Sequence, residues 1–311
     1  MPQLPSLRCP GCREVISESA YINKPPRATQ FDDCLRRCET CGIGASNAAV
    51  PGTVTYIYRD PLANIPIESR EGASDALGQA LNVHNRQSKR RLFGFSTSED
   101  AVTWVVFTYL LRAGQLLSAL RRAGLITGEN ITTAPTLLLW GTPVDNGVLG
   151  MEIRRQLCDL CANLHESPNR YSEPDVIVDL GAAGVIFIEV KHRSPNDCKL
   201  ADYHGWSKYA SADRLTWQIE DVKASGCYEL ARNWCILKNL AAERPSTLVN
   251  LGARTLFFGA EGARLDRFVA GLNTDERSQF LRVTWSDFLT GCLGDVPDWF
   301  SLFCRGRRLL A

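Results

Sequence analysis

The chain lacks the features that would place it in a membrane or send it out of the cell. No apolar run among its 311 residues approaches the ~18–20 residues that a bilayer-spanning helix needs. Its first residues, MPQLPSLRCPGC, contain no apolar signal core. Neither sign of charge is in excess, since 35 Lys and Arg face 34 Asp and Glu. We therefore expect a soluble, cytoplasmic protein without a membrane partner, and not a histone-like coat on nucleic acid.

Several catalytic signatures are absent as well. The sequence contains no G-x-S-x-G, no G-x4-G-K-[ST], no G-x-G-x-x-G and no H-E-x-x-H. These absences leave serine-hydrolase, P-loop, dinucleotide-binding and zincin chemistry without support. The 45% hydrophobic and 22% charged residues are typical of a globular protein. The length allows about two domains, or one large domain with a small appendage.

Cysteine, in contrast, is abundant and unevenly distributed. Five of the 12 cysteines lie in the first 41 residues, where Cys9-Pro-Gly-Cys12 and Cys38-Glu-Thr-Cys41 form two C-x2-C pairs. Each such pair directs two sulfurs at one ion in zinc knuckles. The sequence therefore predicts a structural Zn²⁺ in a segment too poor in apolar residues to fold without metal. Cys34 is an alternative ligand, through Cys34-x3-Cys38.

Changes in composition divide the chain into three parts. We predict a zinc-ribbon-like module over residues 1–48, a linker and basic segment over 49–95 with a short strand at 54–58, and a large domain over 96–311. Ser96 and Glu99 are expected to cap the first helix of that domain as a capping box. Apolar spacing predicts helices over 96–120, 151–164, 213–242 and 286–293, the last capped by Ser286, and strands over 137–140, 176–180, 185–190, 255–258 and 281–284.

The segment 173–191 is the most informative part of the chain. Two β-branched runs are separated by Gly-Ala-Ala-Gly, which predicts a hairpin. A turn about its two alanines places Asp175 beside Glu189 or Val190. Strand alternation places Glu189 and Lys191 on one face. Two carboxylates that meet at one end of a hairpin repel each other, and a divalent cation relieves that repulsion.

These residues carry a resemblance to a known superfamily. Pro174-Asp175, thirteen intervening residues and Glu189-x-Lys191 resemble the PD-(D/E)XK nucleases, which include many restriction endonucleases. Over roughly residues 96–290, the resemblance implies an α/β fold with a restriction-endonuclease-like core, in which helices flank a mixed central sheet. It also implies phosphodiester hydrolysis that depends on Mg²⁺ or Mn²⁺.

The resemblance also implies roles for individual residues. Asp175 and Glu189 would ligate the magnesium ion, and the backbone carbonyl of Val190 would add a ligand. Lys191 would position or activate the attacking water. Many members add a glutamate from the first core helix, for which Glu99 is the candidate in this sequence, followed by Asp100.

The sequence thus predicts a metal-dependent endonuclease that acts on nucleic acid, most simply DNA, with antiviral restriction as one setting among several. Cutting both strands of a duplex with one site per chain favours a homodimer or a partner protein. Strand preference and the choice between DNA and RNA stay open. The alternative is a non-catalytic zinc-ribbon protein that binds nucleic acid or assembles complexes on a nuclease-like fold. The presence of Asp175, Glu189 and Lys191 together argues against that alternative.

Overall fold

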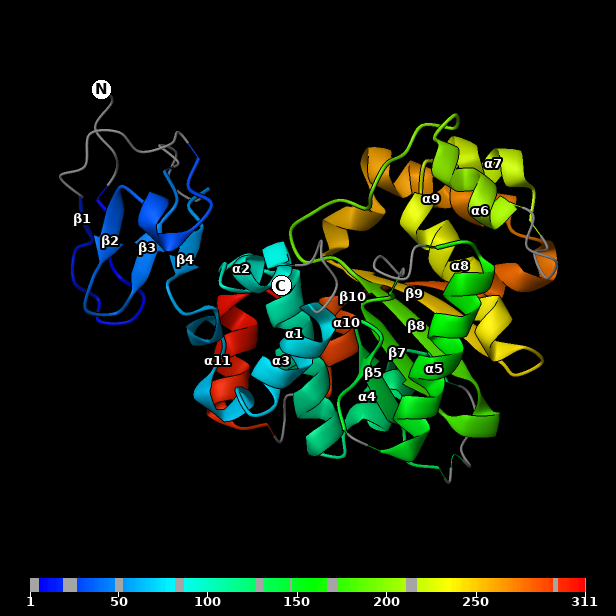
Figure 1. Ribbon diagram of the computed structural model, residues 1–311, viewed down its shortest axis with the longest axis horizontal. Helices are drawn as coiled ribbons and strands as arrows, with labels where there is room; N and C mark the ends of the chain where they lie inside the picture. The colour runs from blue at the N-terminus through cyan, green and yellow to red at the C-terminus, as the bar shows by residue number, and fades with distance from the viewer. Residues whose placement is uncertain are drawn as a thin grey trace.

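The protein folds around two β-sheets. The structure, a computed structural model, describes all residues except 1–5, 19–26, 48–52, 82–86, 127–130, 132, 146, 167–172, 211–216, 293–295 and 311. The smaller sheet has the strand order β1-β2-β3-β4, and the larger, mixed sheet has the order β10-β9-β8-β7-β5-β6. Figure 1 shows the small sheet in blue at one end of the molecule and the helices gathered around the large sheet.

The elements have the following bounds. The strands are β1 (Ser17–Glu18), β2 (Arg36–Cys38), β3 (Ile43–Ala45), β4 (Tyr56–Tyr58), β5 (Thr136–Leu139), β6 (Thr142–Pro143), β7 (Val176–Asp179), β8 (Val185–Val190), β9 (Ser246–Gly252) and β10 (Phe280–Thr284). The helices are α1 (Ala73–Leu81), α2 (Gln87–Phe93), α3 (Glu99–Arg112), α4 (Leu116–Arg122), α5 (Val148–Asn163), α6 (Ser207–Ala210), α7 (Ile219–Ser225), α8 (Tyr228–Ala241), α9 (Gly259–Gly271), α10 (Trp285–Leu289) and α11 (Asp298–Gly306).

The small sheet has little apolar support of its own. Its strands pair antiparallel throughout, and β4 matches the short strand predicted within 54–58. One cluster beneath it has only Cys9, Ile16 and Ile43 as buried members. A core of this size cannot offset the conformational entropy of ordering the chain, so a further constraint such as a metal is needed. The division of the chain at residues 48 and 95 stays a prediction.

The large sheet begins as an antiparallel meander and ends in parallel strands. β5 pairs with β7 and β7 pairs with β8, all antiparallel, whereas β9 lies parallel to β8 and β10 lies parallel to β9. The return from β8 to a parallel neighbour needs a crossover, which contains α8. In the hairpin Val176 faces Ile188, so extending this register by one residue sets Asp175 opposite Glu189, as the sequence predicts.

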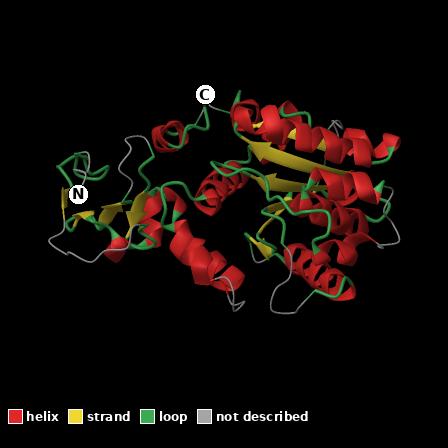
Figure 2. Cartoon of the chain, turned by 90° about the horizontal axis from the view of Figure 1, so that it is seen from above, coloured by secondary structure: helices red, strands yellow, loops and turns green. Residues whose placement is uncertain are grey.

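Alternation along the strands gives the sheet two buried faces. Ile186 and Ile188 join a core with α1, α3, α4, α10 and α11, whereas Val185 and Phe187 join a core with α5, α7, α8 and α9. Figure 2 shows helices on both sides of the large sheet. By the same alternation Glu189 projects to the α8 side of the sheet, and Asp175 projects to that side as well.

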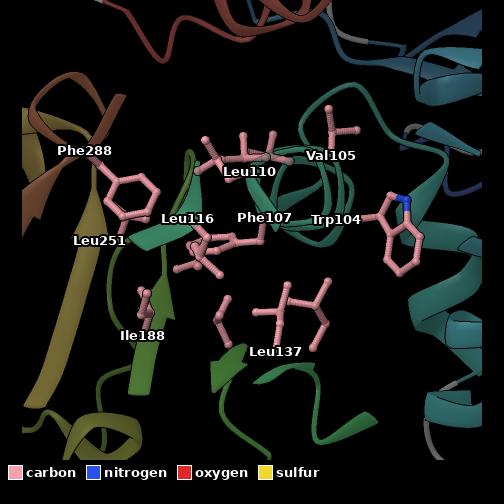
Figure 3. Close-up of a cluster of buried hydrophobic side chains, with 14 of the residues drawn as sticks. Trp104, Val105, Phe107, Leu110, Leu116, Leu137, Ile188, Leu251 and Phe288 are labelled. Atoms are coloured by element: carbon pink, nitrogen blue, oxygen red, sulfur yellow. The ribbon is translucent and has the colours of Figure 1, made fainter. Parts of the chain in front are cut away.

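Helix α3 is apolar around most of its surface because it is enclosed. Residues 101–108 are all buried, and exposure is confined to the two ends of the helix. This is the pattern of a central helix and not of a surface helix. Figure 3 shows Trp104, Phe107 and Leu110 of this helix in one cluster that also contains Leu137 of β5 and Phe288 of α10. This packing fixes the N-terminus of α3, and therefore Glu99, against the end of the sheet.

Three predicted helices differ from the observed ones. The helix expected over 96–120 is divided into α3 and α4, with Gly114 at φ +67° between them. The part of the helix expected over 213–242 that the structure describes is divided into α7 and α8 at Gly226, which has φ +70°. A positive φ is accessible to glycine at little cost and ends a helix. The helix expected over 286–293 is α10, which ends at Leu289.

Three local predictions are wrong. Ser96 does not cap α3; Ser98 does, through its hydroxyl oxygen, which accepts from the Ala101 amide at 3.2 Å. Thr284, not Ser286, caps α10 in the same way. The strand expected over 255–258 is a 3₁₀ turn over Arg254–Phe257, and the parallel strand is β9. Within the described part of the chain, no helix has the length and hydrophobicity to cross a bilayer.

Candidate functional site

The four predicted cysteines come together at the small sheet. Their ligand sulfurs all lie within 4.8 Å of one another, and the residues are Cys9, Cys12, Cys38 and Cys41. The side chain of Cys12, burial and the other thiols raise the pKa of Cys41 to about 12. Four sulfurs so close cannot all be thiolates unless a cation balances their charge. The cluster could therefore hold a structural metal such as zinc, by the tetrahedral thiolate chemistry of such sites.

Cys34, the alternative ligand, lies outside this cluster. Its side chain is buried with Ala28 and Ile57, and its thiol donates to the carbonyl of Gln30 at 3.5 Å. A Cβ on Gly44 would lie 2.5 Å from the Cys34 sulfur. Cys34 therefore acts as a small apolar residue of the module core.

A second group of polar residues lies where β7 and β8 meet at the end of the hairpin. Asp175 accepts a hydrogen bond from the Val190 amide at 2.9 Å through Oδ2. Glu189 is 4% exposed and has a partner at each oxygen. Its Oε2 accepts from Asn233 Nδ2 at 2.7 Å, and its Oε1 lies 2.8 Å from Lys191 Nζ. These contacts hold both carboxylates at the same end of the two neighbouring strands.

Lys191 bridges two carboxylates at this end of the strands. Besides Glu189, its ammonium group contacts Glu229 Oε2 of α8 at 3.1 Å. Its backbone is fixed too, because its carbonyl accepts from Trp285 Nε1 at 3.1 Å. Although burial opposes it, the charges of Glu189 and Glu229 raise the pKa of Lys191. The side chain is therefore an ammonium ion throughout the neutral range and acts as a donor, not as a base.

Asp175 is in the opposite electrostatic situation. Burial, followed by the charge of Glu189, raises the pKa of Asp175 well above its usual range. A carboxyl whose pKa is higher in the folded than in the unfolded protein adds stability at low pH, and that stability is lost as the pH rises through the folded pKa. An aspartate at this position therefore costs stability as the pH rises, unless a cation faces it.

Replacing Asp175 with asparagine should accordingly stabilise the protein at neutral pH when no divalent cation has been added. Asparagine can still accept from the Val190 amide, and it removes the repulsion with Glu189. A gain of about 1 kcal/mol corresponds to roughly 2–4 °C in a domain of this size, measurable by scanning calorimetry. As a control, Asp179→Asn should lower the melting temperature, because Asp179 pairs with Arg244 at 2.8 Å. A lower melting temperature for Asp175→Asn would contradict this electrostatic account.

Glu99 reaches the same place from the other side of the sheet. Its Oε2 accepts from the His192 amide at 2.7 Å, and both of its oxygens lie 3.0 Å from the Ser194 hydroxyl. Burial raises the pKa of Glu99, and the charge of Lys191 opposes this rise. The carboxylate thus anchors the segment that follows Lys191.

One pocket of about 460 Å³ connects these groups. Its lining includes every candidate predicted for the nuclease-like site, and the residues are Glu99, Asp100, Asp175, Glu189, Val190 and Lys191. Asp100 is paired with Lys89 at 3.1 Å. The carboxylates are less tightly grouped than the thiols: within the described residues, only the four cysteines form a metal-ligand group within 4.8 Å.

Sequence reasoning missed most of what α8 contributes. Glu229, Arg232 and Asn233 have the i, i+3, i+4 spacing of one helix face, and the first two line the pocket. The long polar side chains of Gln218, Lys223 and Arg232, on or next to α7 and α8, are candidates for phosphate contacts. Lys223 is engaged elsewhere, since its ammonium group pairs with Glu220, and neither Gln218 nor Lys223 lines the pocket. The i, i+3, i+4 spacing of three polar residues near the start of this helix was the available signal.

The position of Asp179 beside the hairpin turn predicts a solvated carboxylate, but the structure buries it. It is 2% exposed and accepts from the Gly181 amide at 2.7 Å as well as from Arg244. It therefore stabilises the turn end of the hairpin, at the opposite end of β7 from the pocket.

Comparison of the chain with family models, curated proteins and solved structures found no match.

Proposed function

We propose that this protein is a divalent-metal-dependent nuclease that hydrolyses phosphodiester bonds, with DNA as the expected substrate. The observation that carries the proposal is that Asp175, Glu189 and Lys191 lie at the same end of two neighbouring strands and line one pocket. A buried acidic pair beside an ammonium ion has no evident structural advantage, because burying charge is costly.

The order of elements supports the proposal. A helix (α3), an antiparallel meander (β5, β7, β8), a further helix (α8) and a parallel strand (β9) occur in this order along the chain, with α4, β6, α5, α6 and α7 inserted between them. This is the order that the resemblance to PD-(D/E)XK nucleases implies. Asp175 and Glu189 lie at the ends of β7 and β8, where that resemblance implies the metal-binding residues.

The residues present fit Mg²⁺ or Mn²⁺ at this place. Both ions prefer oxygen ligands, and two carboxylates, Asp175 and Glu189, line the pocket. The Val190 amide points toward Asp175, and in a strand the carbonyl of the same residue points to the same side. Asp175, Glu189 and the Val190 carbonyl are therefore the proposed ligands, with Glu99 as a third carboxylate. When bound, the ion would polarise the scissile phosphate and lower the pKa of a water molecule.

The chain's own groups orient that reaction. The Lys191 ammonium can donate to the attacking water and to the negative charge that develops on the phosphate. Glu229 keeps Lys191 protonated and in place, and Asn233 holds the Glu189 carboxylate. Arg232, on the same wall of the pocket, supplies a second positive charge for a phosphate.

At the other end of the molecule we propose that the cysteine cluster binds zinc and that the small sheet helps to hold substrate or a partner. A role in antiviral defence stays a prediction from the resemblance.

The test is cleavage of a substrate panel by zinc-loaded protein. Supercoiled plasmid, linear duplex, single-stranded DNA and RNA are incubated with Mg²⁺, Mn²⁺, Ca²⁺ or no added divalent metal. We expect cleavage of DNA with Mg²⁺ or Mn²⁺ only. If folded, zinc-loaded protein cuts nothing in the panel, the nuclease proposal fails and the non-catalytic alternative is favoured.

A further inference from the structure

A second hollow lies beside the proposed active site, between the small sheet and the C-terminal helix. It measures about 730 Å³. Its lining includes three arginines and several aromatic residues, and none of the described residues that line it is acidic; the charged and aromatic members are Tyr56, Tyr58, Arg193, Trp299, Phe303, Arg307 and Arg308. We call this hollow the arginine groove. Figure 1 shows α11, in red, below and to the right of β4, whose Tyr56 and Tyr58 line the other wall.

The arginines of the groove carry positive charge that pairs with no carboxylate among the residues that the structure describes. Arg307 is 8% exposed, and its guanidinium donates to backbone and side-chain oxygens of Asn64 and to the carbonyl of Ser96. Burial lowers the pKa of Arg307 to about 10. Arg193 and Arg308 are exposed, and their side chains have no hydrogen bond or ion pair with any described residue. Unpaired arginines facing one hollow favour an anionic ligand.

The two exposed arginines lie close enough to affect each other. Burial and then the charge of Arg308 lower the pKa of Arg193. They come from segments more than 100 residues apart, one following β8 and the other following α11. Bringing like charges together from distant segments costs free energy, which a phosphate between them would offset.

The groove and the pocket around Glu189 are adjacent. Ser96 lines the groove, and Thr97, Ser98 and Glu99 line the pocket. Arg193 follows Lys191 by two residues, and His192 between them connects the sites: its amide donates to Glu99, and its Nε2 lies 2.8 Å from the Arg307 carbonyl. A polymer that enters one site can therefore continue into the other.

We propose that the arginine groove binds an unpaired strand of nucleic acid that continues out of the Glu189 pocket, with phosphates at Arg193 and Arg308. The aromatic residues select unpaired bases, because a base inside a duplex has both faces covered by its neighbours and cannot stack on a side chain. This inference rests on the proposed function for the identity of the polymer and extends it to substrates with a single-stranded part.

The test is a binding measurement that contains no cleavage step. Fluorescence anisotropy follows a labelled single-stranded DNA of about 20 nucleotides binding to full-length protein, without added divalent metal or chelator, so that bound zinc is retained. The Arg193→Ala/Arg308→Ala variant should bind at least about 10-fold more weakly, and the slope of log K against log salt should fall by about 1.4, the value for two phosphate contacts on a single strand. Arg267→Ala is the control: this exposed arginine lies on α9, away from the groove, and should change neither quantity.

Three outcomes would overturn the inference. Unchanged affinity and salt slope in the double variant would show that the arginines do not contact the strand. Equal affinity and equal arginine dependence for a duplex of the same sequence would contradict the preference for unpaired bases. Equal affinity for a mononucleotide would indicate a nucleotide site instead of a strand path. Arginine-dependent binding without cleavage of any substrate would instead refute the nuclease proposal and still support strand binding in the groove.

Discussion

Replacing Glu189 with glutamine is expected to reduce phosphodiester cleavage at least about 1000-fold, because an ion that supplies several kcal/mol of transition-state stabilisation loses a charged ligand. Glutamine has nearly the same shape, and its oxygen can still accept from Asn233, but its NH2 group cannot accept from Lys191. Lys191 keeps its second partner, Glu229, at 3.1 Å. The fold should therefore survive, and single-turnover cleavage kinetics measured beside calorimetry separate lost chemistry from lost structure.

Asp179→Asn is the matched control for this variant. Asp179 is a buried carboxylate of the same hairpin, but it lies at the turn end and pairs with Arg244. Below its melting temperature, Asp179→Asn should cut DNA at a rate within about threefold of the wild type. A change outside the pocket that leaves the pocket intact does not alter transition-state contacts. A Glu189→Gln protein that still cuts within tenfold of the wild type would show that Glu189 does not hold the ion.

The second large effect concerns the small sheet. Cys38→Ser should abolish stoichiometric zinc binding and unfold the N-terminal module, because structural zinc contributes about 10–16 kcal/mol to the folding of comparable peptides and the apolar cluster around Ile43 is small. Zinc content by mass spectrometry should fall from about one ion per chain toward zero. Proteolysis of the first 60 residues should become faster at the same time.

Cys34→Ser separates zinc ligation from general damage to the module. Cys34 lies outside the four-sulfur cluster and packs in the core beside Ile57. This variant should keep its zinc and lose only some stability. The assignment of the ligands is wrong if Cys34→Ser loses the metal or if Cys38→Ser retains it.

What the sequence predicted well depends on contacts between residues close together in the chain. The hairpin follows from two β-branched runs about a glycine turn, and its register brings Asp175 opposite Glu189. The cysteine cluster follows from the geometry of C-x2-C pairs, which is local to each pair. In both cases the spacing itself restricts where the functional atoms can lie.

What the sequence could not predict depends on partners far along the chain. Ser96 is as good a helix cap as Ser98, but its hydroxyl accepts from the Tyr56 amide at 2.9 Å, 40 residues earlier. Asp179 is buried because Arg244, 65 residues later, pairs with it.

The misplaced parallel strand has a similar cause. The segment 255–258 has strong local strand propensity, whereas β9 contains the polar Asn250, which is buried and exchanges hydrogen bonds with Asn196 at 3.0 Å. Tertiary contacts of this kind override local propensity.

The most direct measurement of the central claim is the rate of DNA cleavage as a function of Mg²⁺ concentration, for the wild type and for Glu189→Gln at equal zinc content. The account predicts a saturable rise from no detectable cleavage in the wild type. It predicts no rise in the variant over the same range. Cleavage by the wild type without added divalent metal, or equal magnesium-dependent cleavage by Glu189→Gln, would contradict a metal-dependent nuclease site at the end of this hairpin.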